Sequence, residues 1–405
     1  MNNIKIFSRI KPNANNNADT CVFNNNDTII VKKQQKAYLN NYIVDCNYKL
    51  DKVFDDKCAN MDIYNYISIE ILRSILKYNK NATFYVYGQT GSGKTHTILG
   101  DHKIKGKEEE GFVSLILRDI LDINYPVSVT LVEIYNNKCY DILNNKRLIH
   151  QRENHDKKFV MCNIQKKDIK TKQDIAELNH IILENRQTGI SSENNTSSRS
   201  HLQINIEFNN HFLKIMDLAG CEKAKVSICA NRDSYKENGE INQSLFALKE
   251  CIRALVDKKP HIPYRKCELT KMLRQSFDPE SKTYVLSTVS QDVYNSNTTI
   301  DVLNYITDMK KIKCVQKRQM PKIPKPVPRQ LQQLPSIKEK YAIGSPKYNM
   351  INSNKHILQK LSNMETNVLN KILDRKSSKD LFDNYTEILE KKRKILMNEN
   401  IKKQI

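Results

Sequence analysis

Residues 88–95, GQTGSGKT, place three glycines, a lysine and a threonine at the spacing G-x-x-x-x-G-K-[ST]. Glycines let backbone N–H groups approach a polyphosphate, and the helix N-terminus that follows adds partial positive charge. Lys94 could then reach the β- and γ-phosphates, and the Thr95 hydroxyl could bind Mg²⁺. Residues 82–87, ATFYVY, read as a buried strand that aims the turn. A chance glycine-rich turn is the alternative, but the strand before it and the helix-compatible segment after it favour a nucleoside triphosphate site.

Two further segments carry residue types that a triphosphatase needs. An apolar strand at 212–216 leads into Asp217-Leu218-Ala219-Gly220-Cys221-Glu222. An acid at a strand end can hold the Mg²⁺ shell through water, and a nearby glycine N–H can sense the γ-phosphate. Residues 194–201, NNTSSRSH, gather hydroxyls and one arginine just before another strand. Alone they fit a polar loop equally well; beside the other two segments they predict a nucleotide-sensing loop.

The remaining pattern predicts the elements that position these segments. Apolar residues recur every four positions over 60–78, and helices are also expected at 112–123 and 172–188. Strands are expected at 4–10, 28–31, 48–54, 82–87, 127–135, 202–206 and 212–216. Alternating strands and helices predict an α/β fold with a central sheet covered on both faces.

Composition restricts the class of protein. The 405 residues carry a net charge of +21, and the part after Lys313, with 20 Lys and Arg against 8 Asp and Glu, carries +12 of it. Such a balance favours a polyanionic partner: nucleic acid, an acidic protein lattice or an anionic membrane. The ten cysteines form no C-x-x-C pair, and no apolar run reaches the length of a membrane span. These features predict a soluble intracellular protein with reduced thiols.

The chain changes character beyond Lys313. Residues 317–335 contain five prolines and no acid, so we expect a basic linker over 314–350. Apolar residues at helical spacing follow within 351–405, which predicts a basic helical tail, either a short coiled coil or a helical hairpin. A coiled coil would allow two copies of the chain to pair. Residues 391–394, KKRK, could bind a polyanion or direct nuclear import, but such runs are more often a solvated helix face.

GQTGSGKT, residues 194–201 and residues 217–222 together resemble the three nucleotide elements of kinesin motor domains, in order and in separation. The resemblance covers roughly residues 3–313, and it predicts a motor domain over 1–313. It implies the kinesin P-loop NTPase fold, a central sheet flanked by helices on both faces, with ATP and Mg²⁺ as ligands. Microtubules are the implied partner.

The resemblance also implies roles by position. The phosphates would be bound by Gly88, Gln89, Thr90, Gly91, Ser92, Gly93, Lys94 and Thr95, and the adenine by Arg9, Lys11, Pro12 and His96. Kinesins usually have an arginine where Lys11 stands. Thr95 and Ser198 would bind Mg²⁺, with Asp217 acting through water. Gly220 would contact the γ-phosphate. Arg199 and Glu222 would form the salt bridge that positions the attacking water, so no covalent nucleophile is expected.

Within kinesins, Lys249-Glu250-Cys251 and Arg253 resemble the K-E-C-x-R of family 13, which depolymerises microtubules from their ends. The implied microtubule-binding cations are Lys36, Lys249, Arg253, Arg265, Lys266, Lys271 and Arg274. Two features depart from that family. Lys36-Ala37-Tyr38 stands where its members carry Lys-Val-Asp at the tip that levers tubulin ends, and the motor begins almost at Met1, without a long basic neck.

These features together predict a microtubule-stimulated ATPase that acts at microtubule ends, in the cytoplasm and on the spindle. A directional walker is the alternative within the family. A nucleotide-dependent microtubule scaffold with slow hydrolysis is a second alternative. A nucleic-acid-dependent ATPase would suit the charge but leaves residues 194–201 and the K-E-C-x-R segment unexplained, so we expect no specific nucleic acid and no membrane as partners.

Overall fold

The computed structural model describes residues 3–13, 20–36, 41–101, 109–155, 158–187, 199–222 and 232–312. The chain divides into two units, residues 1–316 and 317–405, and all described residues lie in the first. The expected linker and helical tail lie outside the described residues, and the domain boundaries stay predictions. In the described part of the chain, no helix has the length and apolar character needed to cross a membrane.

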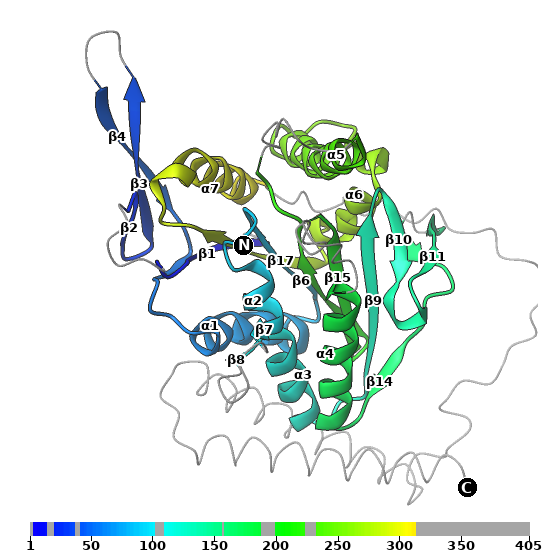
Figure 1. Ribbon diagram of the computed structural model, residues 1–405. Coiled ribbons are helices and arrows are strands. Elements are labelled where there is room, and N and C mark those ends of the chain that lie inside the picture. Colours follow the sequence, from blue (N-terminus) through cyan, green and yellow to red (C-terminus); the bar gives the residue numbers. More distant parts are fainter. Residues whose placement is uncertain are drawn as a thin grey trace, which may run out of the picture. The chain divides into compact units, whose positions relative to one another are not determined.

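A large mixed sheet forms the centre of the described residues (Figure 1). Its strand order is β11 (Arg147–Ile149), β10 (Lys138–Asp141), β9 (Val127–Tyr135), β15 (His201–Phe208), β16 (His211–Asp217), β6 (Asn81–Gly88), β17 (Ser281–Val289), β1 (Ile4–Ile10) and β5 (Lys52–Phe54), with β14 (Lys167–Ile169) paired to β9. The pairs from β16 through β6, β17 and β1 to β5 are parallel, and the others are antiparallel. The α/β class is therefore confirmed. The parallel half of the sheet contains β6, the strand that leads into the glycine-rich turn.

Strand β6 shows why helices cover both faces. Phe84 and Val86 belong to one buried apolar cluster, whereas Tyr85 and Tyr87 belong to the other, as the two-residue period of a strand requires. The first cluster is covered by α1 (Asn60–Leu72), α2 (Lys94–Leu99), α3 (Phe112–Asp122) and α4 (Lys172–Gln187). The second is covered by α5 (Arg232–Val256), α6 (Glu268–Leu273) and α7 (Ser296–Lys310). Figure 1 shows these two groups on opposite sides of the sheet.

The predicted elements are confirmed with two corrections. The strand expected at 48–54 is in fact two strands, because the chain turns at Leu50 and Asp51. Ile6 N donates to the Asp51 carboxylate at 2.8 Å, which carries the chain from β4 (Asn41–Lys49) to β5 in the large sheet. The helix expected at 60–78 is α-helical only to Leu72, and a π-helical turn, Arg73–Lys77, completes it.

Smaller elements complete the described fold. Strands β2 (Val22–Asn25), β3 (Thr28–Lys36) and β4 form a separate antiparallel sheet. Two short hairpins pair β7 (Gly100–Asp101) with β8 (Glu109–Glu110), and β12 (Gln151–Glu153) with β13 (Phe159–Met161). Short 3₁₀ helices in the described part of the chain are η2 (Ile142–Asn144), η4 (Tyr264–Lys266), η5 (Arg274–Phe277) and η6 (Val293–Asn295).

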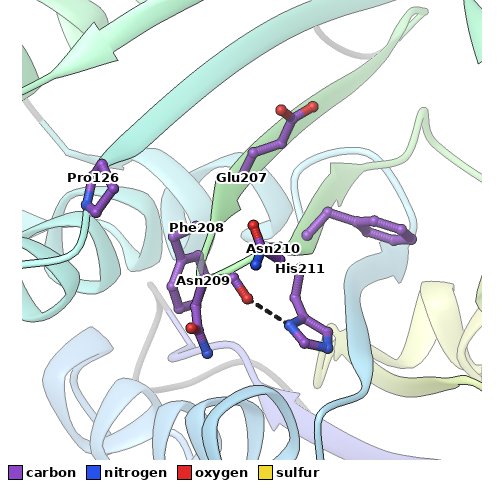
Figure 2. Close-up of a pocket in the computed structure, with 7 residues that line it drawn as sticks. Pro126, Glu207, Phe208, Asn209, Asn210 and His211 are labelled. Atoms are coloured by element: carbon purple, nitrogen blue, oxygen red, sulfur yellow. Dashed lines mark hydrogen bonds between the residues drawn. The ribbon is translucent and has the colours of Figure 1, made fainter. Parts of the chain in front are cut away.

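A shallow hollow lies at the turn between β15 and β16 (Figure 2). Pro126 and residues 207–212 line it, and His211 Nδ1 lies 2.7 Å from the Asn209 carbonyl oxygen. Strand β16 starts here and reaches Asp217 only at its other end. The hollow is therefore at the opposite sheet edge from the glycine-rich turn and does not contribute to that site.

Lys214, on β16, is a buried lysine in the middle of the sheet. Its side chain is 8% exposed, and its Nζ donates to Gln275 Oε1 at 2.8 Å. Nζ also lies 4.7 Å from the centroid of the Phe212 ring. Burial lowers the pKa of Lys214 from 10.5 to about 8, because an ammonium ion loses hydration in this environment. The lysine thus ties β16 to the segment after α6 at a cost in stability near neutral pH.

Replacing this lysine should make the protein more stable near neutral pH. The folded state disfavours the charged lysine, so the unfolded chain binds more protons between pH 8 and about 10.4. At pH 7, Lys214→Met should raise the free energy of unfolding by about 2 kcal/mol. Removing the buried charge gains about 3 kcal/mol, and losing the hydrogen bond to Gln275 costs about 1 kcal/mol. Urea unfolding at several pH values measures the difference.

This gain should shrink as pH rises above 8 and should be absent near pH 10.5, where the wild-type lysine is neutral in the folded state and only about half protonated in the unfolded chain. Lys311→Met, at an exposed lysine paired with Asp308, is the control and should show no such pH dependence. A gain in the free energy of unfolding for Lys214→Met that stays constant from pH 7 to pH 10.5 would contradict a lowered pKa of Lys214.

Candidate functional site

The glycine-rich turn leaves the end of β6 and enters α2 directly. Gly91 and Gly93 have φ values of 75° and 101°, a left-handed region that favours glycine, and a Cβ on either would meet no atom within 4 Å. The turn therefore leaves open space above its backbone. Ser92 Oγ donates to the Gln89 carbonyl oxygen at 2.7 Å and lies 2.6 Å from Thr288 Oγ1 on β17. These contacts hold the turn in a shape that can surround an anion.

Gly88 is required for a different reason. It pairs with Thr288 in the parallel register of β6 and β17, and a Cβ at Gly88 would overlap the Thr288 carbonyl oxygen and lie 2.6 Å from its Oγ1. Neither atom is at the far end of a flexible side chain. The first residue of the turn can therefore be only glycine if the two strands are to stay paired.

Lys94 and Thr95 lie at the start of α2, where the sequence predicts phosphate and Mg²⁺ contacts. Lys94 is 5% exposed, and its Nζ donates to the carbonyl oxygens of Gly88 and Gln89 at 3.0 and 2.8 Å. Thr95 Oγ1 donates to Asp217 Oδ2 at 2.7 Å. The structure thus brings the turn and the end of β16 into direct contact at two of the three residues expected to bind the metal.

The donor set at this contact fits Mg²⁺. A hydroxyl and a carboxylate supply oxygen, and Mg²⁺ prefers oxygen ligands while keeping several of its own waters. Thr95 would bind the ion directly and Asp217 through water. Ser198, the third predicted ligand, lies outside the described residues.

The segment after β16 packs against the glycine-rich turn. Thr90 N donates to Glu222 Oε2 at 2.8 Å, and Cys221 N donates to the Gly88 carbonyl oxygen at 3.3 Å. A Cβ at Gly220 would overlap Thr90 Oγ1 and lie 2.6 Å from both Glu222 oxygens. Gly220 and Glu222 are therefore adjacent to each other and to the turn. This is the arrangement that a γ-phosphate sensor beside a water-positioning carboxylate needs.

The residues expected around the adenine lie on the other side of the turn. Lys11 Nζ donates to the Gly91 carbonyl oxygen at 2.8 Å, and His96 Nε2 lies 3.2 Å from Glu109 Oε2. Burial lowers the pKa of His96, so its neutral form is favoured at physiological pH. Pro12 follows β1 and is exposed.

Arg9 reaches this region from within the fold. Arg9 is 6% exposed, and its guanidinium donates to Asn60 Oδ1 at 2.5 Å and to Thr97 Oγ1 at 2.8 Å. Burial lowers its pKa. These contacts join β1 to α1 and α2, so Arg9 helps to hold α2 in place. Its place beside an adenine stays a prediction.

His201 makes a connection that the sequence does not predict. Ala219 N donates to His201 Nδ1 at 3.0 Å, so the ring proton belongs on Nε2, which lies 2.9 Å from Ser244 Oγ on α5. One buried imidazole thus joins the segment after β16 to the helix that carries Lys249. The motif contained His201, but only the fold shows what it contacts. Arg199, two residues earlier, is half-buried where the chain enters β15.

The predicted basic face is largely paired with acids of the same chain. Glu153, on β12, contacts both Arg265 and Arg274, the latter at 2.9 Å. Lys266 Nζ lies 2.6 Å from Glu250 Oε2, and Lys271 pairs with Glu268. Hydrogen bonds from Arg265 and Arg274 lower the pKa of Glu153, which keeps it ionised. Much of the positive charge that the sequence assigns to this face is therefore compensated locally.

Three predicted cations differ from this group. Arg253 is exposed on α5, and Lys249 Nζ lies 5.7 Å from the centroid of the Tyr305 ring on α7. The predicted apolar face of α5 is confirmed, since Leu245, Leu248 and Ile252 are buried and Leu255 is half-buried. Lys36 ends β3, but its side chain and residues 37–40 lie outside the described part.

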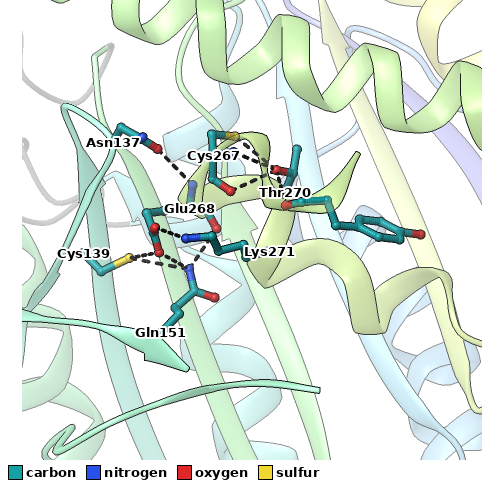
Figure 3. Close-up of polar contacts among 8 residues, drawn as sticks. Asn137, Cys139, Gln151, Cys267, Glu268, Thr270 and Lys271 are labelled. Atoms are coloured by element: carbon teal, nitrogen blue, oxygen red, sulfur yellow. Dashed lines mark hydrogen bonds and ion pairs between the residues drawn. The ribbon is translucent and has the colours of Figure 1, made fainter. Parts of the chain in front are cut away.

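Figure 3 shows the contacts that fix α6 beside this face. Gln151 Nε2 donates to Glu268 Oε2 at 2.8 Å and to the Glu268 carbonyl oxygen at 2.9 Å. The Glu268 amide donates to Asn137 Oδ1 at 2.9 Å, and the buried Cys139 thiol, whose pKa burial raises to about 12, lies beside the same carboxylate. Glu268 therefore attaches the start of α6 to β10 and β12.

Comparison with known proteins agrees with this geometry. A family model described as the kinesin motor domain matches residues 9–312. The Kinesin-like protein KIF24 of Homo sapiens is 32% identical over an alignment of 302 residues, and the alignment covers 71% of this chain and 22% of that protein. The chain thus spans about a fifth of that relative. The structure of a fast kinesin, described with its implications for ATPase mechanism and interactions with microtubules, matches with a TM-score of 0.66 at 26% identity, covering 82% of this chain and 98% of that one.

Proposed function

This chain belongs to the kinesin family, and we propose that it is a microtubule-stimulated ATPase that acts at microtubule ends and depolymerises them. Kinesin motor domains hydrolyse ATP. The observation that carries the ATPase part is the direct contact of Gly220 and Glu222 with the glycine-rich turn, through Thr90. The end-acting part rests on the K-E-C-x-R residues, Lys249, Glu250, Cys251 and Arg253, in α5.

The residues around the turn take the following roles in this proposal. Backbone N–H groups of residues 88–95 and the Lys94 ammonium would bind the phosphates. Lys11, Pro12, His96 and Arg9 would line the adenine. Gly220 donates its N–H toward the γ-phosphate. Thr95 and Ser198, with Asp217 through water, would hold the Mg²⁺, which would neutralise charge on the phosphates.

Hydrolysis then depends on where the attacking water is held. The Thr90 N–H donates to one Glu222 oxygen and so holds the carboxylate against the turn. An Arg199–Glu222 salt bridge would place a water in line with the γ-phosphate, directly or through a second water. No proton has to be removed by a strong base, because the barrier is lowered chiefly by position and charge.

A directional motor is the second candidate. The feature that favours it is the tip, where Ala37 and Tyr38 stand in place of the valine and aspartate of family 13. A depolymerase must bind a curved tubulin dimer better than a straight lattice, because a ligand shifts an equilibrium only by its differential affinity. With an incomplete tip, that difference must come mainly from α5 and the segments beside it.

The first test concerns the attacking water. Arg199→Ala and Glu222→Ala should each bind ATP almost as tightly as the wild type and lower turnover by about two orders of magnitude. The reason is that the water is no longer held in line, while the phosphate contacts remain. Steady-state phosphate release and binding of a fluorescent ATP analogue measure the two effects. Near-normal turnover in both variants would remove these residues from the mechanism.

The second test decides between depolymerase and walker. Wild-type protein with ATP should shorten stabilised microtubules slowly from their ends, as seen by fluorescence microscopy. Lys249→Ala with Arg253→Ala should abolish shortening, because two charged contacts of about 1–3 kcal/mol each are lost. Lys52→Ala with Lys166→Ala removes the same charge from other elements and should leave shortening unchanged. Steady gliding without shortening would reject the end-acting assignment and leave only a motor.

The third test concerns the acid that pairs with two predicted binding arginines. Glu153→Gln should release Arg265 and Arg274 to meet the acidic tubulin surface, and microtubule affinity should rise about threefold at low ionic strength. The gain should fall as salt is added. Glu207→Gln, which changes the same charge on β15, is the control in a co-sedimentation assay. Unchanged or weaker binding for Glu153→Gln would mean that the pairing helps the face to bind.

A further inference from the structure

An ion pair with a buried carboxylate joins two elements that lie beside the predicted arginine of the site. Glu133 Oε2 on β9 lies 3.0 Å from Lys146 Nζ, in the turn between η2 and β11. The Glu133 side chain is 9% exposed and that of Lys146 is 36% exposed. A buried carboxylate is costly unless it is paired and hydrogen-bonded. The Glu133 carboxylate therefore depends on its partners to stay ionised in this position.

Each partner makes a second contact, and the two second contacts are in different elements. Glu133 Oε1 accepts a hydrogen bond at 2.8 Å from Ser200 Oγ, and Ser200 is 1% exposed and directly follows Arg199. Lys146 Nζ donates to the Asn185 carbonyl oxygen, in the last turn of α4, at 2.8 Å. One ion pair thus fastens the end of α4 and the start of β15.

The backbone supports this arrangement. Glu133 is paired with Leu202 in the antiparallel register of β9 and β15, which sets its side chain beside the start of β15. Lys146 has φ 53°, and the preceding Asn145 has φ 48°. A lysine in the left-handed region costs roughly 1–2 kcal/mol, and such strain persists where the surroundings fix it, often near functional sites.

We propose that Glu133 and Lys146 are positioning residues for ATP hydrolysis. Glu133 fixes Ser200 and so the backbone from which Arg199 projects. Lys146 contacts both Glu133 and the end of α4, and so keeps these two parts together. This inference rests on the proposed ATPase and on the role proposed for Arg199. The competing interpretation is a purely structural ion pair that stabilises the sheet edge and has no influence on Arg199.

The test is a double-mutant cycle with Arg199. Lys146→Met should lower ATP turnover about tenfold, with affinity for a fluorescent ATP analogue within about twofold, because a small misplacement of a positioning group costs rate more than binding. In the Arg199→Ala background, Lys146→Met should have no further effect on turnover. Lys146→Arg keeps the charge and the donors and should restore most of the rate.

Lys167→Met is the matched control. Lys167 pairs with Glu177 at 3.0 Å and also joins α4 to the sheet, through β14. It should change turnover less than twofold. Thermal melting of every variant identifies any that is unfolded. Glu133→Gln, which can still hydrogen-bond Ser200, gives a second variant and should lower turnover less than Lys146→Met.

The outcomes separate this proposal from the proposed function. If Arg199→Ala lowers turnover but Lys146→Met does not, or if Lys146→Met loses the same factor in both backgrounds, the positioning role is overturned and the ATPase stands. If the wild type hydrolyses no ATP, the proposed function fails. Amide hydrogen exchange at residues 185–187 and 199–201 then tests by itself whether the Glu133–Lys146 pair holds these two segments. Faster exchange in Lys146→Met supports that role, and unchanged exchange overturns it.

Discussion

The parallel pairing of β6 with β16 on one side and β17 on the other is the constraint on which the site depends. Parallel strands bring their carboxyl ends to one edge of the sheet, where ligand sites of open α/β folds lie. The glycine-rich turn follows β6, Asp217 ends β16, and Thr288 lies next to the end of β17. The strands approach so closely that Gly88 has no space for a Cβ. The contacts of Thr95 and Thr90 with the β16 side follow from this packing.

The sequence predicted the elements of the fold well, because each has a local cause. The structure brings the glycine-rich turn into contact with residues 217–222, whereas most of residues 194–201 lies outside the described part of the chain. The spacing of glycines, a two-residue strand period and apolar residues every four positions are readable without tertiary contacts. The split at Leu50 and Asp51 was not readable, since it depends on a hydrogen bond from Ile6, far away in sequence. The contacts of Glu133 and Lys214 were hidden for the same reason. A single polar residue inside an apolar strand was their only signal.

The basic face shows a different limit of sequence reasoning. Counting cations predicted a strongly positive surface, but Glu153, Glu250 and Glu268 compensate four of its members. Exposed ion pairs contribute little to stability, so these carboxylates matter more for the field that the face presents to a partner. Arg253 is exposed, whereas the arginines paired with Glu153 can reach an acidic partner only by exchanging one carboxylate for another. Such exchange favours selectivity over raw affinity.

Elements that contact both a nucleotide site and a distant binding face can carry coupling between the two. His201 is one such contact, because its Nδ1 accepts from the Ala219 backbone and its Nε2 lies against Ser244 in α5. Ala219 directly precedes Gly220, and α5 also carries Lys249 and Arg253. A shift of the backbone at Gly220 must therefore either move the imidazole or break a buried hydrogen bond, which is costly. Either response changes the contact between β15 and α5. The His201 side chain therefore links the backbone next to Gly220 to the helix that carries Lys249 and Arg253.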